Sequence, residues 1–435
     1  MLSFLAAILL GSVLLVLPIS SASGQSVPYT DALFTATTAT CVTGLVTLPT
    51  FSTWSLFGHI VILVLIQIGG LGIITVLSGL LIAFHCKMDL GDRLLLQDAF
   101  NLNTLSGLAD FIKRVILGTL AVEGVGALLY MTVFVPDFGA RGIWISVFTA
   151  ISAFCNAGID IIGANSLCDY ALHPMVNTVT CLLIVLSGLG YTVWWDVLRV
   201  FREKRHRKLR SLTLHSKIAI TATLALILAG AVGVFLFEHG NPLTMGGFTL
   251  PQKIGASLFQ SITTRTAGFA TLPQQDLTNG TAILSLLLMF IGGSPVGTAG
   301  GVKTVTVVVL AAGAIASIRN RDEVDLFGRQ ISKESISKAS AVVASSFAIM
   351  ILSTLLLSAV ADAPALDILY ETVSATATVG LTRDLTPHLN TAGKLIIAAT
   401  MYLGRCGPIS LAIAFGTRRG GKNIVKNPIE EISVG

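Results

Sequence analysis

Charged residues are scarce in this sequence of 435 residues. Asp, Glu, Lys and Arg make up 12% of it, about half the share found in soluble domains. The six cysteines form no Cys-x-x-Cys pair and no cluster with histidine, which argues against a zinc site or a disulfide framework. The His-Glu-x-x-His and Gly-x-Ser-x-Gly motifs are absent as well, so an intramembrane hydrolase has no support. We therefore predict that the chain is not an enzyme.

Apolar residues are abundant instead. They form 53% of the chain, with a mean hydropathy of +0.82, which excludes a disordered protein. Because about 20 apolar residues span a bilayer, the apolar runs predict eight membrane spans, near 2–19, 57–84, 112–135, 175–198, 217–237, 281–316, 340–361 and 394–416. The first run could be a cleaved signal peptide, but no positive charge precedes it, which favours a retained span.

The basic residues are sorted to one side of these spans. Of the 28 Lys and Arg, 21 lie between spans two and three, four and five, or six and seven, or in the tail 417–435. The positive-inside rule makes that side cytoplasmic and places both termini there, as expected for a multi-pass protein of a cytoplasmic membrane. The basic run 199–210 could suggest nucleic-acid binding, but a topology signal near anionic lipid is the simpler interpretation.

Short apolar stretches that end in small residues and a glycine recur between paired spans. Their loop glycines are separated by 114, 110 and 112 residues, which indicates an internal repeat. The stretches lie at 31–45, 146–159, 257–269 and 369–381 and contain Gly44, Gly158, Gly268 and Gly380. The predicted repeats are 1–84, 112–198, 217–316 and 340–416, followed by a cytoplasmic tail over 417–435.

A glycine-rich break follows each loop glycine by 24 to 29 residues, inside the second span of the repeat. The breaks read IGGLG, LSGLG, IGGSPVGTAGG and LGRCG, at 68–72, 186–190, 291–301 and 403–407. Non-helical backbone at membrane depth survives only where it is buried or lines water. The predicted fold class is therefore an all-α integral membrane protein: four tandem helix–pore-loop–helix repeats, with eight transmembrane spans and four re-entrant half-helices, around a central pore on a pseudo-fourfold axis.

Such loops suit a monovalent cation. A ring of backbone carbonyls can replace the hydration shell of the ion, and re-entrant helices direct the negative ends of their dipoles at the pore centre. A loop glycine allows positive φ angles without steric cost. We expect a single glycine per loop to give fewer ion sites and weaker discrimination between K⁺ and Na⁺ than a full Thr-Val-Gly-Tyr-Gly string.

The strings TATCVTGL (38–45), AFCNAGID (153–160), TTRTAGF (263–269) and SATATVGL (374–381) resemble the pore loops of the Trk/Ktr/HKT potassium transporters. The strings LLLQDAFNLNTLSGL (94–108) and GGSPVGTAGGVKT (292–304) resemble the KtrB-type bacterial subunit. The resemblance covers nearly the whole chain. It implies a K⁺-translocating homodimer with one pore per chain, a cytoplasmic ring of nucleotide-binding RCK subunits that bind ATP or ADP, and Na⁺ as an activating or co-transported ion. No cofactor on this chain is implied.

Carried over by position, the resemblance assigns K⁺ binding to five residues of each loop. The two residues before each glycine and the glycine itself are the strongest candidates. The assigned residues are Thr40, Cys41, Val42, Thr43 and Gly44; Phe154, Cys155, Asn156, Ala157 and Gly158; Thr264, Arg265, Thr266, Ala267 and Gly268; and Thr376, Ala377, Thr378, Val379 and Gly380.

The sixth span contains Pro295 and five glycines between 292 and 301, so we expect it to unwind. This segment is predicted to be a gate under the filter, although a structural kink is the alternative. Arg405 lies in the last break, where a mid-span arginine costs about 2.5–3.5 kcal/mol. We predict that it binds carbonyls of the gate and sets an electrostatic barrier; a snorkelling side chain or a structural ion pair is the alternative. The predicted gate residues are Gly292, Gly293, Ser294, Pro295, Gly297, Thr298, Ala299, Gly300, Gly301, Lys303 and Arg405.

Arg265 lies inside the third loop, where a cation facing the pore would repel the ion. We predict that it points away and pairs with Asp160 or Glu371 behind the filter. Acidic residues outnumber basic ones in the outer segments, which suits a vestibule that concentrates cations. An ordinary solvated face is the alternative.

The predicted function is K⁺ uptake through a simple carbonyl filter. A secondary transporter of another cation or a small organic solute, with inverted repeats, is the alternative. Four units of the same orientation argue against it, because they give a fourfold axis along the membrane normal.

Overall fold

The computed structural model describes residues 2–83, 108–203, 211–321 and 323–407. The first half contains the helices α1 (Leu2–Val16), α2 (Tyr29–Cys41), α3 (Thr50–Thr53), α4 (Leu56–Leu71), α5 (Ile73–Ala83), α7 (Leu108–Phe138), α8 (Arg141–Cys155), α9 (Pro174–Leu189) and α10 (Tyr191–Arg202). The second half contains α11 (Leu214–Glu238), α12 (Leu250–Thr263), α13 (Asn279–Phe290), α14 (Thr304–Ile318), β1 (Val324–Leu326), β2 (Arg329–Ile331), α15 (Lys333–Ser358), α16 (Ala365–Ala377) and α17 (Thr391–Cys406). The sequence string 94–107, the basic residues 204–210 and the tail 417–435 lie outside the described residues.

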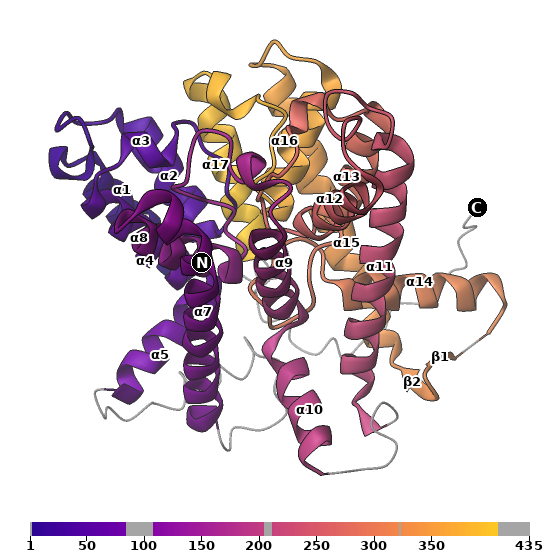
Figure 1. The fold of residues 1–435 in the computed structure, drawn as a ribbon. Helices are drawn as coiled ribbons and strands as arrows, with labels where there is room; N and C mark the ends of the chain where they lie inside the picture. The colour runs from indigo at the N-terminus through magenta and orange to yellow at the C-terminus, as the bar shows by residue number, and fades with distance from the viewer. Residues whose placement is uncertain (1, 84–107, 204–210, 322, 408–435) are drawn as a thin grey trace, which may run out of the picture.

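Within the described residues, three helices are long and apolar enough to cross a membrane: α7, α11 and α15. They coincide with the predicted first spans of repeats two, three and four. In Figure 1, α7 and α11 both run roughly vertically. The pair α9 and α10 passes the same length and composition criteria as a fourth span, bent by 93°. Five further apolar helices are shorter, with 12 to 16 residues: α1, α4, α8, α13 and α14.

The first three predicted second spans are not single helices. The run 57–84 is divided into α4 and α5 at Gly72, and the run 175–198 bends at Gly190; in the fourth repeat, α17 ends at Cys406, before Gly407. These glycines have φ angles of 84°, 87° and 77° with ψ angles of 134°, 147° and 138°. Only glycine adopts this conformation readily, so the glycine-rich breaks interrupt the helices that hydropathy alone had joined.

Four short helices occupy the predicted pore-loop positions: α2, α8, α12 and α16. They have 13, 15, 14 and 13 residues, hence about 20–22 Å of length, too little for a hydrocarbon core of about 30 Å. Most of their residues are buried, polar ones included. They are interior helices, as a re-entrant arrangement requires.

Each short helix packs against two units of the chain. Besides contacts within its own predicted repeat, α8 contacts α4, α12 contacts α9, α16 contacts α13, and α2 contacts α17. The last pair brings the beginning and the end of the described chain together, seen in Figure 1 as indigo helices beside yellow ones. The ion pair between Lys394 Nζ and Asp31 Oδ1, 2.5 Å long, joins this seam.

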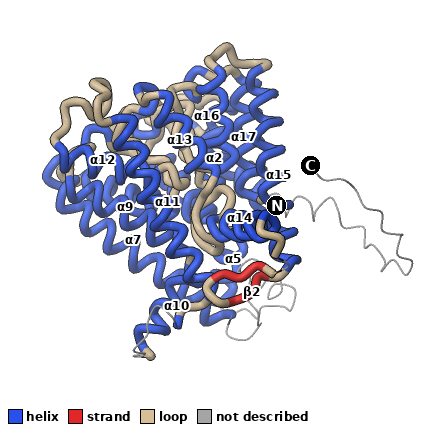
Figure 2. Tube along the Cα trace, turned by 90° about the vertical axis from the view of Figure 1, so that its right-hand side faces the viewer, coloured by secondary structure: helices blue, strands red, loops and turns tan. Residues whose placement is uncertain are grey.

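Non-helical backbone lies inside this arrangement. Figure 2 shows tan loops between helices at the centre of the molecule, beside α14. The prediction of an all-α fold missed one feature: β1 and β2 form an antiparallel hairpin in which Val324 pairs with Ile331. Phe327 and Gly328 have positive φ angles at its turn, and three-residue strands give hydropathy no periodic signal.

Candidate ion-binding site

The four short helices converge on turns of similar shape. The residue two before each loop glycine is left-handed: Val42, Asn156, Thr266 and Thr378 have φ angles of 56°, 58°, 69° and 50°. Valine and threonine are outliers in this region because their branched Cβ atoms crowd the backbone. Such strain persists only where the surroundings impose it and is concentrated at functional sites.

Buried hydroxyls support three of the turns. The hydroxyls of Thr38 and Ser374, each six residues before its loop glycine, accept hydrogen bonds from Gly44 N (2.9 Å) and Gly380 N (3.0 Å). Ser152, at the same position of the second loop, accepts instead from Ile159 N at 3.1 Å. In the third loop the corresponding residue is Ile262, which has no hydroxyl. Here α12 ends five residues before the loop glycine, whereas the other short helices end three before it, and Thr263 Oγ1 donates to Phe269 O. The sequence prediction missed these residues, although a hydroxyl six before the glycine recurs in three repeats.

The loop glycines form a closed ring. Their φ angles are 102°, 63°, 81° and 96°. A methyl group on any of them would collide with the carbonyl oxygen of the residue before the next loop glycine, at 2.5 Å for Gly44 and 2.7 Å for Gly158. The contacts run in cyclic order: Gly44 with Ala157, Gly158 with Ala267, Gly268 with Val379, and Gly380 with Thr43. Four peptide groups from four parts of the chain thus surround one axis.

An open cavity of about 620 Å³ ends on this ring. All four loop glycines line it, together with residues of the segments that follow each loop, such as Asp160, Gln274 and Asp384. No residue of the 292–301 segment is among its lining residues. The ring therefore separates this outer cavity from the glycine-rich breaks.

The electrostatic potential at the ring is negative. The C-terminal ends of α2, α8 and α16 point toward it, and none of the three has a basic residue in its last turn. Of the described residues that line the outer cavity, Asp160 and Asp384 are the charged ones. Burial raises the pKa of Asp160 to about 6, although hydrogen bonds from the Ser166 hydroxyl and from the backbone of Ile162 and Gly163 oppose the shift. A site of this sign and size attracts cations.

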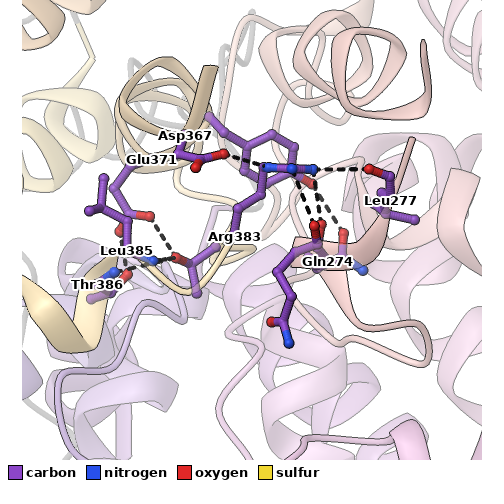
Figure 3. A network of polar contacts seen from close by, with 10 residues as sticks. Gln274, Leu277, Asp367, Glu371, Arg383, Leu385 and Thr386 are labelled. Carbon is purple, nitrogen blue, oxygen red and sulfur yellow. Dashed lines mark hydrogen bonds and ion pairs between the residues drawn. The ribbon is translucent and has the colours of Figure 1, made fainter. Parts of the chain in front are cut away.

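The wall of the outer cavity is held by Arg383, which follows the fourth loop. Its Nε donates to Asp367 Oδ1 at 2.6 Å, and its Nη atoms donate to the carbonyls of Gln274, Gln275 and Leu277 at 3.2–3.3 Å. Figure 3 shows this side chain reaching from the α16 region to the segment before α13. The contact fixes the fourth loop region against the third.

Comparison with known proteins agrees with this geometry. A family model described as a cation transport protein, TrkH, matches residues 4–424. The chain belongs to this family. It is 40% identical to the Ktr system potassium uptake protein B of Bacillus subtilis over 413 residues, which cover 95% of this chain and 91% of that protein. It is 36% identical to the potassium/sodium uptake protein NtpJ of Enterococcus hirae, over 99% of this chain and 95% of that protein.

The fold is also that of a TrkH protein. The crystal structure of the potassium transporter TrkH from Vibrio parahaemolyticus superposes with a TM-score of 0.74 at 16% identity, and covers 95% of this chain and 84% of that chain. The described helices thus have the arrangement of the TrkH fold.

The predicted gate residues of this family member lie on the inner side of the ring. The 292–303 stretch turns back on itself, because Gly292 N donates to Val302 O at 2.9 Å and Thr304 N to Gly293 O at 3.0 Å. It is anchored to the bend of the fourth predicted span, where Ser294 N donates to Gly188 O and Tyr191 N to Val296 O. Pro295 and Gly297 pack in that bend, against Gly190.

Two cations hold the other side of this segment. Arg405 Nη1 donates to Thr298 O at 2.8 Å and its Nη2 to Gly69 O at 2.5 Å. Lys303 Nζ donates to Ala299 O at 2.5 Å. A second cavity, of about 260 Å³, is lined by both side chains, by Gly300 and Gly301, and by the ends of α16 and α17. Because no carboxylate binds Arg405 among the described residues, its charge is satisfied by carbonyl dipoles.

The predicted carboxylate partner of Arg265 is wrong. Its side chain does point away from the ring, but Nη2 donates to Gly292 O at 3.1 Å and to Thr223 Oγ1 at 3.5 Å. The carboxylate of Glu371 is occupied by the hydroxyls of Thr382 and Thr386, as Figure 3 shows for Thr386. A carbonyl freed by the glycine-rich break therefore replaces the acid that the sequence suggested.

Proposed function

We propose that this chain takes up K⁺ through the ring of Gly44, Gly158, Gly268 and Gly380. The observation that carries the proposal is the cyclic contact of each glycine with the carbonyl before the next one. Four backbone carbonyls around an axis can replace water around a monovalent cation. The printed names of the relatives, a potassium uptake protein and a potassium/sodium uptake protein, favour K⁺ as the cargo.

The five residues of each predicted filter stretch contribute unequally in this proposal. The carbonyls of Thr43, Ala157, Ala267 and Val379 lie at the ring, and the left-handed residues before them turn the backbone toward it. Cys41, Cys155 and Arg265, three before the glycine, act behind the filter. Cys155, for example, packs on Gly70 of the first break.

The proposed membrane arrangement has eight spans in four repeats, with both termini in the cytoplasm of a bacterial cell. Three long helices and one bent pair support four of these spans. The repeats 1–84, 112–198, 217–316 and 340–416 are supported by the cyclic packing of their short helices. Second spans broken at glycine fit the same plan.

The segment 292–301, with Lys303 and Arg405, is proposed as the gate. It lies across the inner side of the ring and is held there by the hydrogen bonds of its backbone and of Thr298. The two cations are proposed to oppose ion entry from the cytoplasm while the segment is closed.

Regulation is proposed to come from other subunits. A name such as "Ktr system … protein B" denotes one component of a larger system, and we expect a cytoplasmic RCK ring that binds ATP or ADP, together with a homodimer of this chain. The name of the Enterococcus protein supports Na⁺ as a second transported or activating ion.

The decisive experiment is growth of a bacterial strain that lacks its own K⁺ uptake systems, at low external K⁺. Expression of this chain with a cognate RCK subunit is expected to restore growth and K⁺ uptake, more strongly when Na⁺ is present. An empty vector and a chain with Gly268→Trp, which blocks the ring, are the controls. Failure to restore growth despite normal membrane abundance would overturn K⁺ uptake in favour of the organic-solute transporter, which labelled-solute uptake then tests.

A further inference from the structure

The side chains two before each loop glycine all turn to the inner side of the ring. Val42 packs on Gly69 of the first break. The other three supply polar atoms and meet the gate segment: Asn156 contacts Thr298, and Thr266 and Thr378 both contact Gly300. The ring thus has a second layer beneath it, to which these side chains contribute.

The stretch Thr298–Gly300 presents hydrogen-bond donors to this layer. The hydroxyl of Thr298 donates to Phe154 O, the last-turn carbonyl of α8, at 3.0 Å. Gly300 N donates to Thr266 Oγ1 at 3.1 Å. The carbonyls of Thr298 and Ala299, in contrast, accept from Arg405 and Lys303. The stretch therefore offers its positive groups to the loops and its negative groups to the two cations.

Two oxygens of the layer have no partner. Because the proton of the Thr298 hydroxyl is used on Phe154, that oxygen accepts from Asn156 Nδ2 at 3.1 Å, which leaves Asn156 Oδ1 as an acceptor. Asn156 Oδ1 and Thr378 Oγ1 are buried and have no hydrogen-bond partner within the described residues. Buried polar atoms are rarely left unpaired unless a ligand or water completes them.

We propose that the Phe154 carbonyl and the side-chain oxygens of Asn156, Thr266 and Thr378 form an inner site for a partly dehydrated monovalent cation. This inner site lies one layer below the glycine ring. In the structure two of these oxygens accept hydrogen bonds from the gate segment instead of binding a cation. The Thr298 hydroxyl donates to Phe154 O, and Gly300 N donates to Thr266 Oγ1. K⁺ and the Thr298–Gly300 stretch thus compete for one site, so that ion entry itself displaces the gate. The inference rests on the proposed K⁺ uptake.

The competition separates the effects of two conservative substitutions. Thr298→Val removes a donor that competes with the ion and leaves the oxygens in place, so K⁺ is expected to bind about fivefold more tightly, the factor for one hydrogen bond. Thr378→Val removes an ion ligand that makes no hydrogen bond to the stretch, so K⁺ is expected to bind about fivefold more weakly. Both keep the branched shape, and Thr298→Ser and Thr378→Ser, which keep the hydroxyls, are expected to behave like the parent chain.

The measurement is thermal stabilisation of the purified full-length protein in detergent, titrated with KCl and, as a control, with choline chloride. A ligand that binds the folded state raises the melting temperature in proportion to its occupancy. The half-maximal KCl concentration is expected to fall in Thr298→Val and to rise in Thr378→Val. Thr180→Val is the matched control, because Thr180 is a buried threonine whose hydroxyl pairs with Tyr130, away from the loops.

Uptake of K⁺ by cells gives the second measurement. The KM for K⁺ is expected to move in the same opposite directions, with a higher maximal rate in Thr298→Val. If both variants move the same way, or neither differs from Thr180→Val, the inner site is refuted while K⁺ uptake by the parent chain stands. If the parent chain shows neither K⁺-specific stabilisation nor uptake, it is the proposed function that fails.

Discussion

Substitution of a ring glycine tests the filter most directly, and Gly44→Ser is the sharpest case. Gly44 has a φ angle of 102°, and a Cβ atom there would lie 2.5 Å from Ala157 O. Ordinary contact begins at 3.4 Å, so the carbonyl must move by about 0.9 Å. Gly24→Ser is a matched control, because Gly24 has a φ of 70° but nothing within 4 Å of the added atom. Both variants share a backbone strain of about 1–3 kcal/mol.

Only Gly44→Ser displaces an oxygen of the filter. Loss of one interaction with a charged group is worth about 1.5–3 kcal/mol, so the KM for K⁺ is expected to rise roughly 10- to 100-fold. Preference for K⁺ over Na⁺ is expected to fall with it. Gly268→Ser is expected to act in the same way, because it overlaps the carbonyl of Val379.

The assay is uptake of K⁺ and Na⁺ by cells that lack their own K⁺ uptake systems, normalised to protein in the membrane. Gly24→Ser is expected to match the parent chain in KM and in selectivity. If Gly44→Ser remains as K⁺-selective as Gly24→Ser, with a KM within twofold, the ring of carbonyls is not the filter and the reasoning is refuted.

Three further predictions concern the surroundings of the ring. Arg405→Gln loses the positive charge and the guanidinium group that binds Thr298 O, so the maximal uptake rate is expected to rise several-fold. Arg405→Lys keeps the charge and is expected to change the rate less. An unchanged rate in Arg405→Gln would contradict an electrostatic barrier at this residue. Ser374→Ala leaves Gly380 N without an acceptor at a cost of about 1–3 kcal/mol, so the melting temperature is expected to fall below that of the exposed control Ser358→Ala; equal values would show that the hydroxyl does not support the turn. Asp160→Asn removes a charge from the outer cavity, so the KM for K⁺ is expected to rise. With its pKa raised to about 6, Asp160 is ionised above that pH and neutral below it, so the parent chain is expected to show the same rise in KM as external pH falls through about 6, and a similar pH response in Asp160→Asn would argue against this residue as the cause.

The positions of the ring could be predicted from the sequence because they rest on a period. Gly44, Gly158, Gly268 and Gly380 recur at nearly constant spacing, and the structure places all four in one ring. Each short helix before them is too short to span, which hydropathy and length reveal without knowledge of contacts. The internal repeat therefore predicted that four loops far apart in the sequence come together at the ring.

What escaped prediction depends on local geometry and on partners far apart in sequence. The hydroxyls of Thr38 and Ser374 gave no chemical signal of their own, since their acceptor role appears only when the turn is built. Arg265 was assigned a carboxylate, because sequence reasoning pairs charges with charges. A carbonyl freed by unwinding at Gly292 is an equal partner, but no composition rule displays it.

Hydropathy also failed to divide the second spans. Gly72 and Gly190 lie within continuous apolar runs, so a window average passes over them, whereas their φ angles of 84° and 87° end the helix there. The difference matters, because Tyr191, directly after the second break, binds the gate segment through Val296 O.

The cyclic order of the ring has a consequence for synthesis of the protein. Gly44 is translated first and Gly380 last, yet these two are neighbours, and Lys394 pairs with Asp31 only after both. A nascent chain that ends after the third repeat has three of the four loop glycines and two of the four ring contacts, so the ring stays open on one side. The complete filter forms in a single late step, so an unfinished or truncated chain in the membrane is expected to provide no selective path for ions.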